Sequence, residues 1–174
     1  MVGVSRLIEV CRLTSDDVFV DVGSGIGNVV AQVALESDVA LVVGIEIRRS
    51  LATRGASLIS RFSTRYARLK HVTIIPEDVC SVDATTEPWL RVSVLFCHNT
   101  LFVPHAQLRL EALCCALPKL RLVVLQQSFC HRHSTRCTKE FCMLFLRREE
   151  FSVPVTFKSS LNNFVVFERR GFAI

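Results

Sequence analysis

The sequence lacks the features that mark membrane-spanning and secreted proteins. No uninterrupted apolar run approaches the roughly 20 residues that cross a bilayer, although half of the 174 residues are hydrophobic and the mean hydropathy is +0.38. The first thirteen residues carry Arg6, Glu9 and Arg12 among apolar positions, a pattern typical of neither a secretory signal nor an anchor. We therefore expect no membrane association.

Motifs for cysteine pairing, internal repeats and linkers are missing as well. The eight cysteines are irregularly spaced and include no C-x-x-C pair, so without a secretion signal they indicate reduced thiols in a cytosolic or nuclear protein. No low-complexity tract and no Pro/Gly/Ser-rich linker divides the chain. The length suffices for one sizeable core, and we expect a single domain over residues 1–174.

Short buried-strand segments alternate with amphipathic helical segments. Strands are expected at 18–22, 39–45, 72–75, 92–97 and 120–125, and helices at 4–13, from 29 onward, at 48–70 and at 106–117. Residues 139–147 have mixed periodicity, whereas 151–157 and 163–167 are typical of a closing antiparallel strand pair. The alternation predicts an α/β fold with a doubly wound, mostly parallel sheet and flanking helices.

A glycine-rich turn joins the first strand to the next helix. Residues 18–28 read VFVDVGSGIGN, with Gly23, Gly25 and Gly27 on alternate positions. Backbone without a Cβ at a helix N-terminus can approach a ligand closely. The spacing is G-x-G-x-G, which differs from the G-x-G-x-x-G of dinucleotide-binding proteins.

An acidic residue sets the charge of this turn. Asp21 lies two residues before the first glycine, and a carboxylate there disfavours phosphate and favours a cationic ligand. S-adenosylmethionine fits, since it carries an ammonium and a sulfonium and no phosphate. A degenerate or NAD-type site is the alternative. Further strand ends carry Glu46, which is suited to ribose hydroxyls, Asp78, which is suited to the adenine edge, and Asn99.

Four segments resemble a known family. They are TSDDVFVDVGSGIGNVVAQ (14–32), GIEI (44–47), EDV (77–79) and VLFCHNTLF (94–102). The first closely resembles the cofactor motif of the non-SET histone lysine methyltransferases, the disruptor-of-telomeric-silencing family. The last is similar to its V-x-F-x-N-N-x-x-F signature, the most specific of the four. The resemblance covers roughly residues 5–168.

The resemblance implies a Rossmann-like class I methyltransferase fold, S-adenosyl-L-methionine as cofactor, and a nuclear enzyme. Its implied substrate is a lysine on the globular surface of nucleosomal histone three. Asn99 would line the methyl-transfer site with Phe102 packed nearby, and these two are the expected catalytic residues. The expected cofactor-binding residues are Asp21, Gly23, Ser24, Gly25, Gly27, Asn28, Glu46, Asp78, Val79 and Asn99.

The sequence departs from the family pattern at several positions. Asn28 stands where the family has glutamine, and His98 replaces the first asparagine of its pair. The substrate-channel aromatics map onto Phe157 and Phe164–Val165, without the family's tyrosine hydroxyl. Only 17 residues precede Val18, so we expect the family's N-terminal helical lid to be largely absent. The alternatives to the implied function are a nucleic-acid base methyltransferase, another protein methyltransferase, or a catalytically impaired module that binds the cofactor or the nucleosome.

Basic residues gather in one segment. Between residues 48 and 70 there are seven Lys and Arg and no acidic residue. This indicates either a solvated helix face or a phosphate-contacting patch for nucleosomal DNA. The shared face would carry Arg54, Arg61, Arg65 and Arg68, and the patch could extend through Arg132, Arg136 and Lys139.

A cysteine- and histidine-rich segment, Cys130-His131-Arg132-His133 with Cys137 and Cys142, raises the question of zinc. The segment as a whole does not have the combined C-x2–4-C and H-x3–5-H spacing of a standard zinc site. The sequence therefore predicts no metal site.

Overall fold

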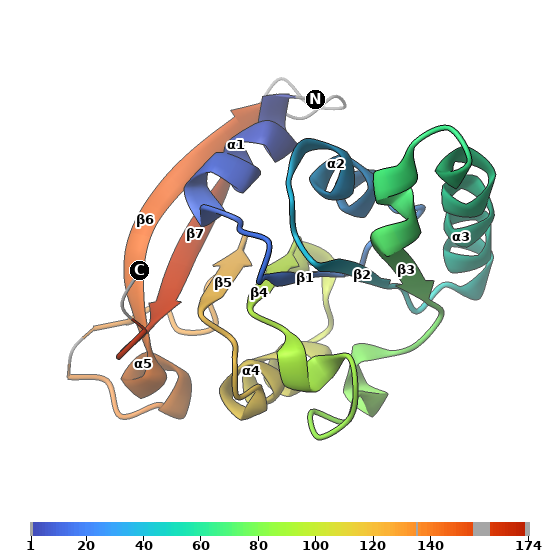
Figure 1. Ribbon diagram of the computed structural model, residues 1–174. Coiled ribbons are helices and arrows are strands. Elements are labelled where there is room, and N and C mark those ends of the chain that lie inside the picture. Colours follow the sequence, from blue (N-terminus) through green and yellow to red (C-terminus); the bar gives the residue numbers. More distant parts are fainter. Residues whose placement is uncertain (1, 135, 155–160, 173–174) are drawn as a thin grey trace.

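A seven-stranded sheet forms the centre of the molecule (Figure 1). The computed structural model describes residues 2–134, 136–154 and 161–172. Its strands are β1 (Val18–Val22), β2 (Leu41–Ile45), β3 (Val72–Ile75), β4 (Val94–Cys97), β5 (Leu122–Leu125), β6 (Phe145–Pro154) and β7 (Leu161–Arg169). The order is β3-β2-β1-β4-β5-β7-β6, with β1 to β5 parallel and β7 antiparallel to both its neighbours. The predicted sheet with its antiparallel closing pair is confirmed.

Helices cover both faces of this sheet. They are α1 (Val2–Cys11), α2 (Asn28–Glu36), α3 (Arg49–Ser63), α4 (Pro104–Ala116), α5 (Glu140–Leu144) and the 3-10 turns η1 (Ala67–His71), η2 (Val79–Ser81), η3 (Trp89–Arg91) and η4 (Asn99–Leu101). Helices α1 to α3 lie on one face, and α4 and α5 lie on the other (Figure 1). Each face has its own apolar cluster, one around Phe19 and Phe96 and the other around Leu95 and Phe167. Burial on both faces explains the uniformly apolar strands.

The helix predicted over 48–70 is wrong after residue 63. Helix α3 ends at Ser63, and the chain turns before η1. The guanidinium of Arg68 donates hydrogen bonds to the carbonyls of Ala34, Ser37 and Val39 at 3.2, 2.9 and 2.7 Å. This tertiary contact docks η1 against the end of α2, and it removes Arg68 from the expected basic helix face.

The strands predicted at 92–97 and 120–125 begin two residues later, at Val94 and Leu122. Residues just before them take part in a buried polar network. The carboxylate of Asp17 accepts hydrogen bonds from Ser93 Oγ at 2.7 Å and from Arg121 Nε and Nη2 at 2.9 and 2.8 Å. Burial acts to raise the pKa of Asp17, but these bonds and one from the Thr14 backbone hold that pKa below its ordinary value. We call Asp17, Ser93 and Arg121 the Asp17 network. It ties together the amino ends of β1, β4 and β5.

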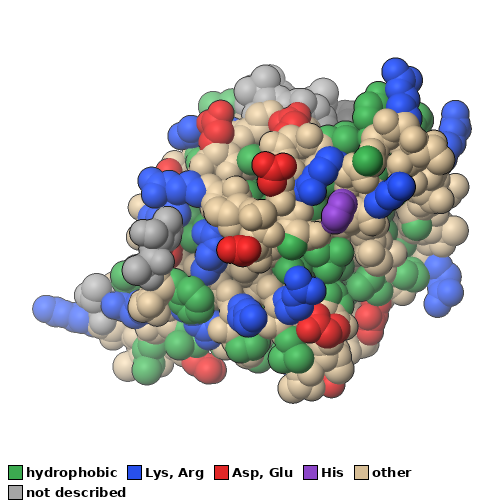
Figure 2. All heavy atoms as spheres, in the orientation of Figure 1, with side chains coloured by type: hydrophobic (Ala, Val, Ile, Leu, Met, Phe, Trp, Pro, Cys, Tyr) green, Lys and Arg blue, Asp and Glu red, His purple; other side chains and the backbone are tan. Residues whose placement is uncertain are grey.

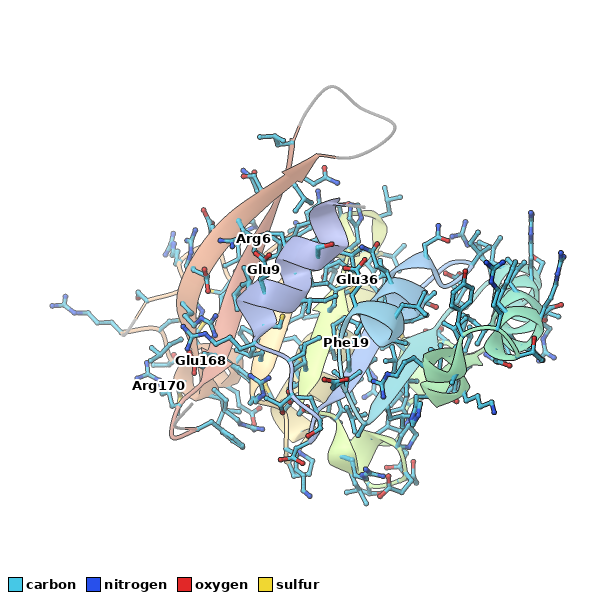
Figure 3. The ribbon with its side chains drawn as sticks, turned by 45° about the horizontal axis from the view of Figure 1, so that its top comes forward. Arg6, Glu9, Phe19, Glu36, Glu168 and Arg170 are labelled. Atoms are coloured by element: carbon cyan, nitrogen blue, oxygen red, sulfur yellow. The ribbon has the colours of Figure 1, made fainter. Side chains whose placement is uncertain are left out.

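Helix α1 crosses the sheet between α2 and the β6–β7 pair (Figure 3). Arg6 and Glu9 lie on its side toward β6, and Glu36 of α2 lies on the other side, where its Oε2 accepts a hydrogen bond from Ser5 Oγ at 2.8 Å. Leu7 is buried in the core beneath the helix. Among the described residues no helix is long and apolar enough to cross a membrane.

The C-terminal strands are longer than predicted. Residues 139–147, with their mixed periodicity, contain α5 and the start of β6, and the predicted strand at 151–157 covers only the later part of β6. Phe157 lies outside the described residues. Strand β7 contains the whole of the predicted 163–167.

Candidate active site

Two cavities lie side by side at the carboxyl ends of the parallel strands, the edge where such sheets bind ligands. The first cavity, of about 550 Å³, lies over the ends of β1, β2 and β3 and against η4. The second cavity, of about 490 Å³, lies between the glycine turn, α1 and the β6–β7 pair. Gly23 and His98 line both, so the two cavities meet there.

The glycine turn has the backbone that its sequence predicts. Gly23, Gly25 and Gly27 have φ of 84°, 58° and 85°, in the left-handed region that favours glycine. A Cβ on Gly27 would lie 2.5 Å from Cδ1 of Ile74, whereas one on Gly25 would meet nothing within 4 Å. Gly27 is therefore needed for packing against β3. Gly25, which lines the second cavity, leaves its backbone open toward a ligand.

Asp21 is a buried acid without a counter-ion. The residue is 3 % exposed and lines the second cavity, and no described residue donates a hydrogen bond to its carboxylate. Burial, together with the charge of nearby Glu46, raises the pKa of Asp21 from 3.8 to about 7. Ser24 Oγ is also buried without a partner among the described residues. A buried hydroxyl without a partner is rare in native proteins and calls for an explanation, as does a buried carboxylate without a counter-charge.

Glu46, at the end of β2, is held ionised. Its Oε2 accepts a hydrogen bond from the Gly25 backbone at 2.9 Å, and its Oε1 accepts two from the backbone and side chain of Arg48 at 2.9 and 3.0 Å. Burial acts to raise the pKa of Glu46, but these bonds lower it below its ordinary value. A carboxylate has about four acceptor sites and these bonds use three, so Oε2 of Glu46 can still accept one hydroxyl group from a ligand in the first cavity.

The far side of the first cavity is shaped by η2 and η4. Asp78 caps η2, because its Oδ1 accepts a hydrogen bond from the Cys80 backbone at 2.9 Å, and buried Val79 follows it. Phe102 closes the cavity near the glycine turn, where its ring lies 3.3 Å from the place that a Cβ on Gly23 would take. Asp78 gives this part of the cavity a polar edge, and Val79 and Phe102 give it two apolar walls. Such a site suits a flat heteroaromatic ring.

Asn99 does not line either cavity. Its side chain is fully buried, and Nδ2 donates to Gln107 Oε1 and to the Gln127 carbonyl, both at 2.8 Å. Its Oδ1 accepts from the Gln127 backbone N–H at 2.9 Å. The amide therefore links η4 to α4 and to the segment after β5. This geometry does not support the methyl-transfer role or the cofactor contact that we expected for Asn99.

His98 takes the position that we expected Asn99 to hold. Its ring is exposed at the junction of the two cavities. Nδ2 of Asn162 lies 3.1 Å from His98 Nε2, and the ring of Phe164 packs 5.8 Å away. The sequence signal for His98 was present, as the residue that departs from the family's asparagine pair. Its importance could be recognised only from the position of the side chain.

Aromatic residues from the closing strands wall the second cavity. Phe151 and Phe164 stack at 5.7 Å, and both line it. Val165 alternates to the other face of the sheet and is buried in the α4-side cluster, so it is not part of this wall. The segment before β1 adds Val4 and Leu7. Asn28, the first residue of α2, lies exposed at the rim.

The residues present fit S-adenosylmethionine. Asp21 is a buried carboxylate with no cationic partner among the residues that the structure describes, and the open space beside Gly25 lies in the same cavity. Glu46 in the first cavity is ionised and can accept a hydroxyl. A ligand that spans both cavities with an ammonium at one end and a ribose and base at the other satisfies these groups.

Comparison with known proteins supports this assignment. A family model described as histone methylation protein DOT1 matches residues 2–155. The chain belongs to the DOT1 histone methylation family. The matched range contains the glycine turn, Glu46, Asp78 and His98, which are the elements of the first cavity and of its junction with the second.

Solved structures with low sequence identity share the fold. An RNA methyltransferase from Salinibacter ruber in complex with S-adenosyl-L-homocysteine has a TM-score of 0.63 at 18% identity, and the match covers 99% of this chain and 92% of that one. The methyltransferase domain of bacterial-CtHen1-C has a TM-score of 0.68 at 13% identity over 96% of both chains. Magnesium protoporphyrin IX methyltransferase from Synechocystis PCC 6803, with bound SAM, reaches 0.64 at 17%, over 97% of this chain and 76% of that one. The DOT1-family chain therefore has the class I methyltransferase fold.

Proposed function

We propose that this chain is an S-adenosylmethionine-dependent histone lysine N-methyltransferase that acts in the nucleus on a globular-core lysine of nucleosomal histone three. Family membership supports histone methylation. The observation that carries the proposal is the junction of two cavities at Gly23 and His98, with the unpaired carboxylate of Asp21 beside it.

The two cavities divide the work of binding. Asp21 and the backbone of Gly25 would hold the amino-acid end of S-adenosylmethionine, Oε2 of Glu46 would accept a ribose hydroxyl, and Asp78 and Val79 would flank the base. The cofactor supplies a methyl group that its sulfonium already activates. The reaction therefore needs alignment of donor and acceptor more than a strong base.

The acceptor amine would enter through the second cavity. A lysine ammonium has a reference pKa of about 10.4, and an apolar environment lowers it and so frees the lone pair. Phe151, Phe164 and Leu7 supply that environment. His98 and Asn162 are the polar groups at its inner end, where they would orient the amine toward the methyl group.

Contact with nucleosomal DNA would come from α3. Arg49, Arg54 and Arg61 of α3 are exposed, as is Arg65 just after the helix, and basic side chains project from the α3 side of the molecule (Figure 2). Each phosphate contact steepens the dependence of affinity on salt. Arg132, Arg136 and Lys139 cannot extend this patch, because they lie between β5 and α5, across the sheet from α3 (Figure 1).

The test is methyl transfer from labelled S-adenosylmethionine to nucleosomes, free histones, RNA and DNA offered separately. We expect label in histone three of nucleosomes. Label in RNA or DNA would favour a base methyltransferase, and cofactor binding without label anywhere would favour a binding module. Either outcome contradicts the proposal.

The same assay tests His98. His98→Ala should lower turnover at least tenfold while cofactor affinity measured by calorimetry stays within a few-fold. His105→Ala is the matched control, since His105 is exposed and lines neither cavity. Full turnover in the His98 variant would remove this residue from the site.

A further inference from the structure

Three cysteines distant from the active site come together at the opposite edge of the sheet from α3. Cys130 and Cys137 lie in the segment between β5 and α5, and Cys142 lies in α5. Their sulfur atoms all lie within 4.8 Å of one another, and Sγ of Cys130 and Sγ of Cys137 are 3.8 Å apart. None of the three lines either cavity.

A histidine lies beside this group. Nδ1 of His133 is 3.1 Å from Sγ of Cys142. The imidazole is half-buried and packs against the rings of Phe141 and Phe167 at 6.2 and 5.0 Å. Metal-binding histidines are held in the same way, with the ring orientation set by its surroundings so that one nitrogen faces the metal.

The spacing of the sulfur atoms is compatible with tetrahedral zinc coordination. With Zn–S bonds of about 2.3 Å, two sulfurs of a tetrahedral site lie about 3.8 Å apart, and a sulfur and an imidazole nitrogen lie about 3.6 Å apart. The observed 3.8 Å between Cys130 and Cys137 matches the first value, whereas the 3.1 Å between His133 Nδ1 and Cys142 Sγ is a hydrogen-bond distance that must lengthen when both atoms bind the metal. Three thiolates and one imidazole form a Cys₃His set, which is typical of structural zinc.

A disulfide explains the arrangement less well. All eight cysteines are free thiols, and the 3.8 Å between Cys130 and Cys137 is far longer than the roughly 2.05 Å of an S–S bond. A disulfide would also leave the third thiol unused beside it. Reduced thiols in a nuclear protein are the state in which such a group binds metal.

We propose that Cys130, His133, Cys137 and Cys142 bind one Zn²⁺ ion with a structural role. The linear spacing predicts no metal site, but the fold gathers three sulfur atoms from a loop and a short helix and places His133 next to Cys142, where its ring can supply the fourth ligand. Bound zinc would cross-link the segment between β5 and α5 to α5 itself. It would thereby hold His133 against β7, and binding would release the thiol protons.

The first experiment measures metal directly. The full chain, purified without chelator, should contain one zinc ion per chain when its metal content is measured by inductively coupled plasma mass spectrometry. Replacement by Co²⁺ should give the thiolate charge-transfer band and the intense visible bands of tetrahedral cobalt. Absence of both, in protein whose thiols are reduced, would overturn the proposal. So would a Cys130–Cys137 disulfide as the stable state.

Matched variants identify the ligands. Cys137→Ser should lose most of the zinc, whereas Cys115→Ser should keep it, since Cys115 is half-buried in α4 outside the group. His133→Asn should retain weaker metal binding with a changed cobalt spectrum. If Cys137→Ser folds by circular dichroism and keeps its zinc, or if His133→Asn leaves the cobalt spectrum unchanged, the proposed Cys₃His set is wrong.

Discussion

Two buried aspartates at opposite ends of β1 have opposite surroundings. Asp17, just before the strand, accepts three side-chain hydrogen bonds from Ser93 and Arg121, and its pKa is lowered. Asp21, within the strand, has no partner among the described residues, and burial raises its pKa to about 7. Both are 3 % exposed, so burial alone does not account for the difference.

The amino end of β1 contributes to stability, whereas its carboxyl end contributes to the candidate site. At the amino ends, the polar groups pair with one another and tie three strands together. At the carboxyl ends, Asp21 has no counter-charge among the described residues and Ser24 Oγ has no hydrogen-bond partner there; burying the Asp21 charge is a cost that a ligand carrying a cation would offset on binding. The same contrast distinguishes Asn99, which is fully bonded, from its neighbour His98, which faces both cavities.

The largest effect is expected at the Asp17 network. Asp17→Asn should lower the free energy of unfolding by about 3 kcal/mol, because it leaves the guanidinium of Arg121 buried without a counter-charge. Urea denaturation measures the change. Because the folded pKa of Asp17 is lowered, its contribution is present above the ordinary pKa and is lost as pH falls through the folded value.

The control for this variant is Glu9→Gln. Arg6 and Glu9 form an exposed pair on α1 with 52% and 65% of their side chains exposed, and its loss should change stability by less than about 0.5 kcal/mol. Equal effects of the two variants would mean that the Asp17 network contributes no more than a surface pair.

A smaller loss of stability is expected for Asn99→Ala. The change removes the partners of Gln127 and Gln107 and should cost about 2 kcal/mol, measured by thermal or urea unfolding. The cofactor affinity of the folded fraction should change little. Asn163→Ala, at an exposed amide on β7, is the matched control. Loss of turnover in a fully stable Asn99 variant would restore the catalytic role that the sequence predicts.

Asp21→Asn should give the smallest change in stability, with the opposite sign. Removing an unpaired buried charge should raise the free energy of unfolding of the cofactor-free protein by on the order of 1 kcal/mol at pH 8. The same change should weaken binding of S-adenosylhomocysteine roughly tenfold or more, since a charge-assisted contact is lost. Calorimetry on one preparation measures both the binding and the unfolding.

The pH dependence of this site follows from the raised pKa. Between about pH 4 and 7 the folded state binds more protons than the unfolded state, so stability of the cofactor-free protein falls as pH rises through that window and levels off above it. A bound ammonium favours the carboxylate, so cofactor affinity should rise from pH 6 to pH 8. Asp21→Asn should remove both dependences, and their persistence would assign them to another group.

Much of the fold could be predicted because its signals are local. Uniformly apolar strands, the helix spacing and the glycines of the turn lie within a few residues of one another. The end of α3 could not be predicted, because Arg68 turns the chain by bonding to carbonyls about thirty positions earlier. The strand starts near Ser93 and Arg121 were displaced for the same kind of reason, since a distant carboxylate recruits these residues.

The site divides along the same line. That Asp21, Gly23, Gly25, Glu46 and Asp78 lie around the cavities could be predicted, since strand ends meet at one edge of the sheet; Gly27, which we also expected at the cofactor, lines neither cavity and packs against β3. His98 and Asn99 are adjacent in the sequence, and only the folded chain decides which faces the cavities. The sequence predicted no metal site at Cys130, Cys137 and Cys142, because the spacing of residues along the chain does not show how a loop folds against a helix.

The sequence by itself determined the parallel sheet, the ligand edge and the charge of the ligand that the glycine turn accepts, because periodicity and strand-end chemistry are carried by neighbouring residues. The tertiary structure decided which polar groups are satisfied. Asp17 and Asn99 are paired by residues far along the chain, Asp21 is not, and the thiols of Cys130, Cys137 and Cys142 meet only after β5 and α5 pack. Pairing depends on three-dimensional proximity, which no local pattern specifies.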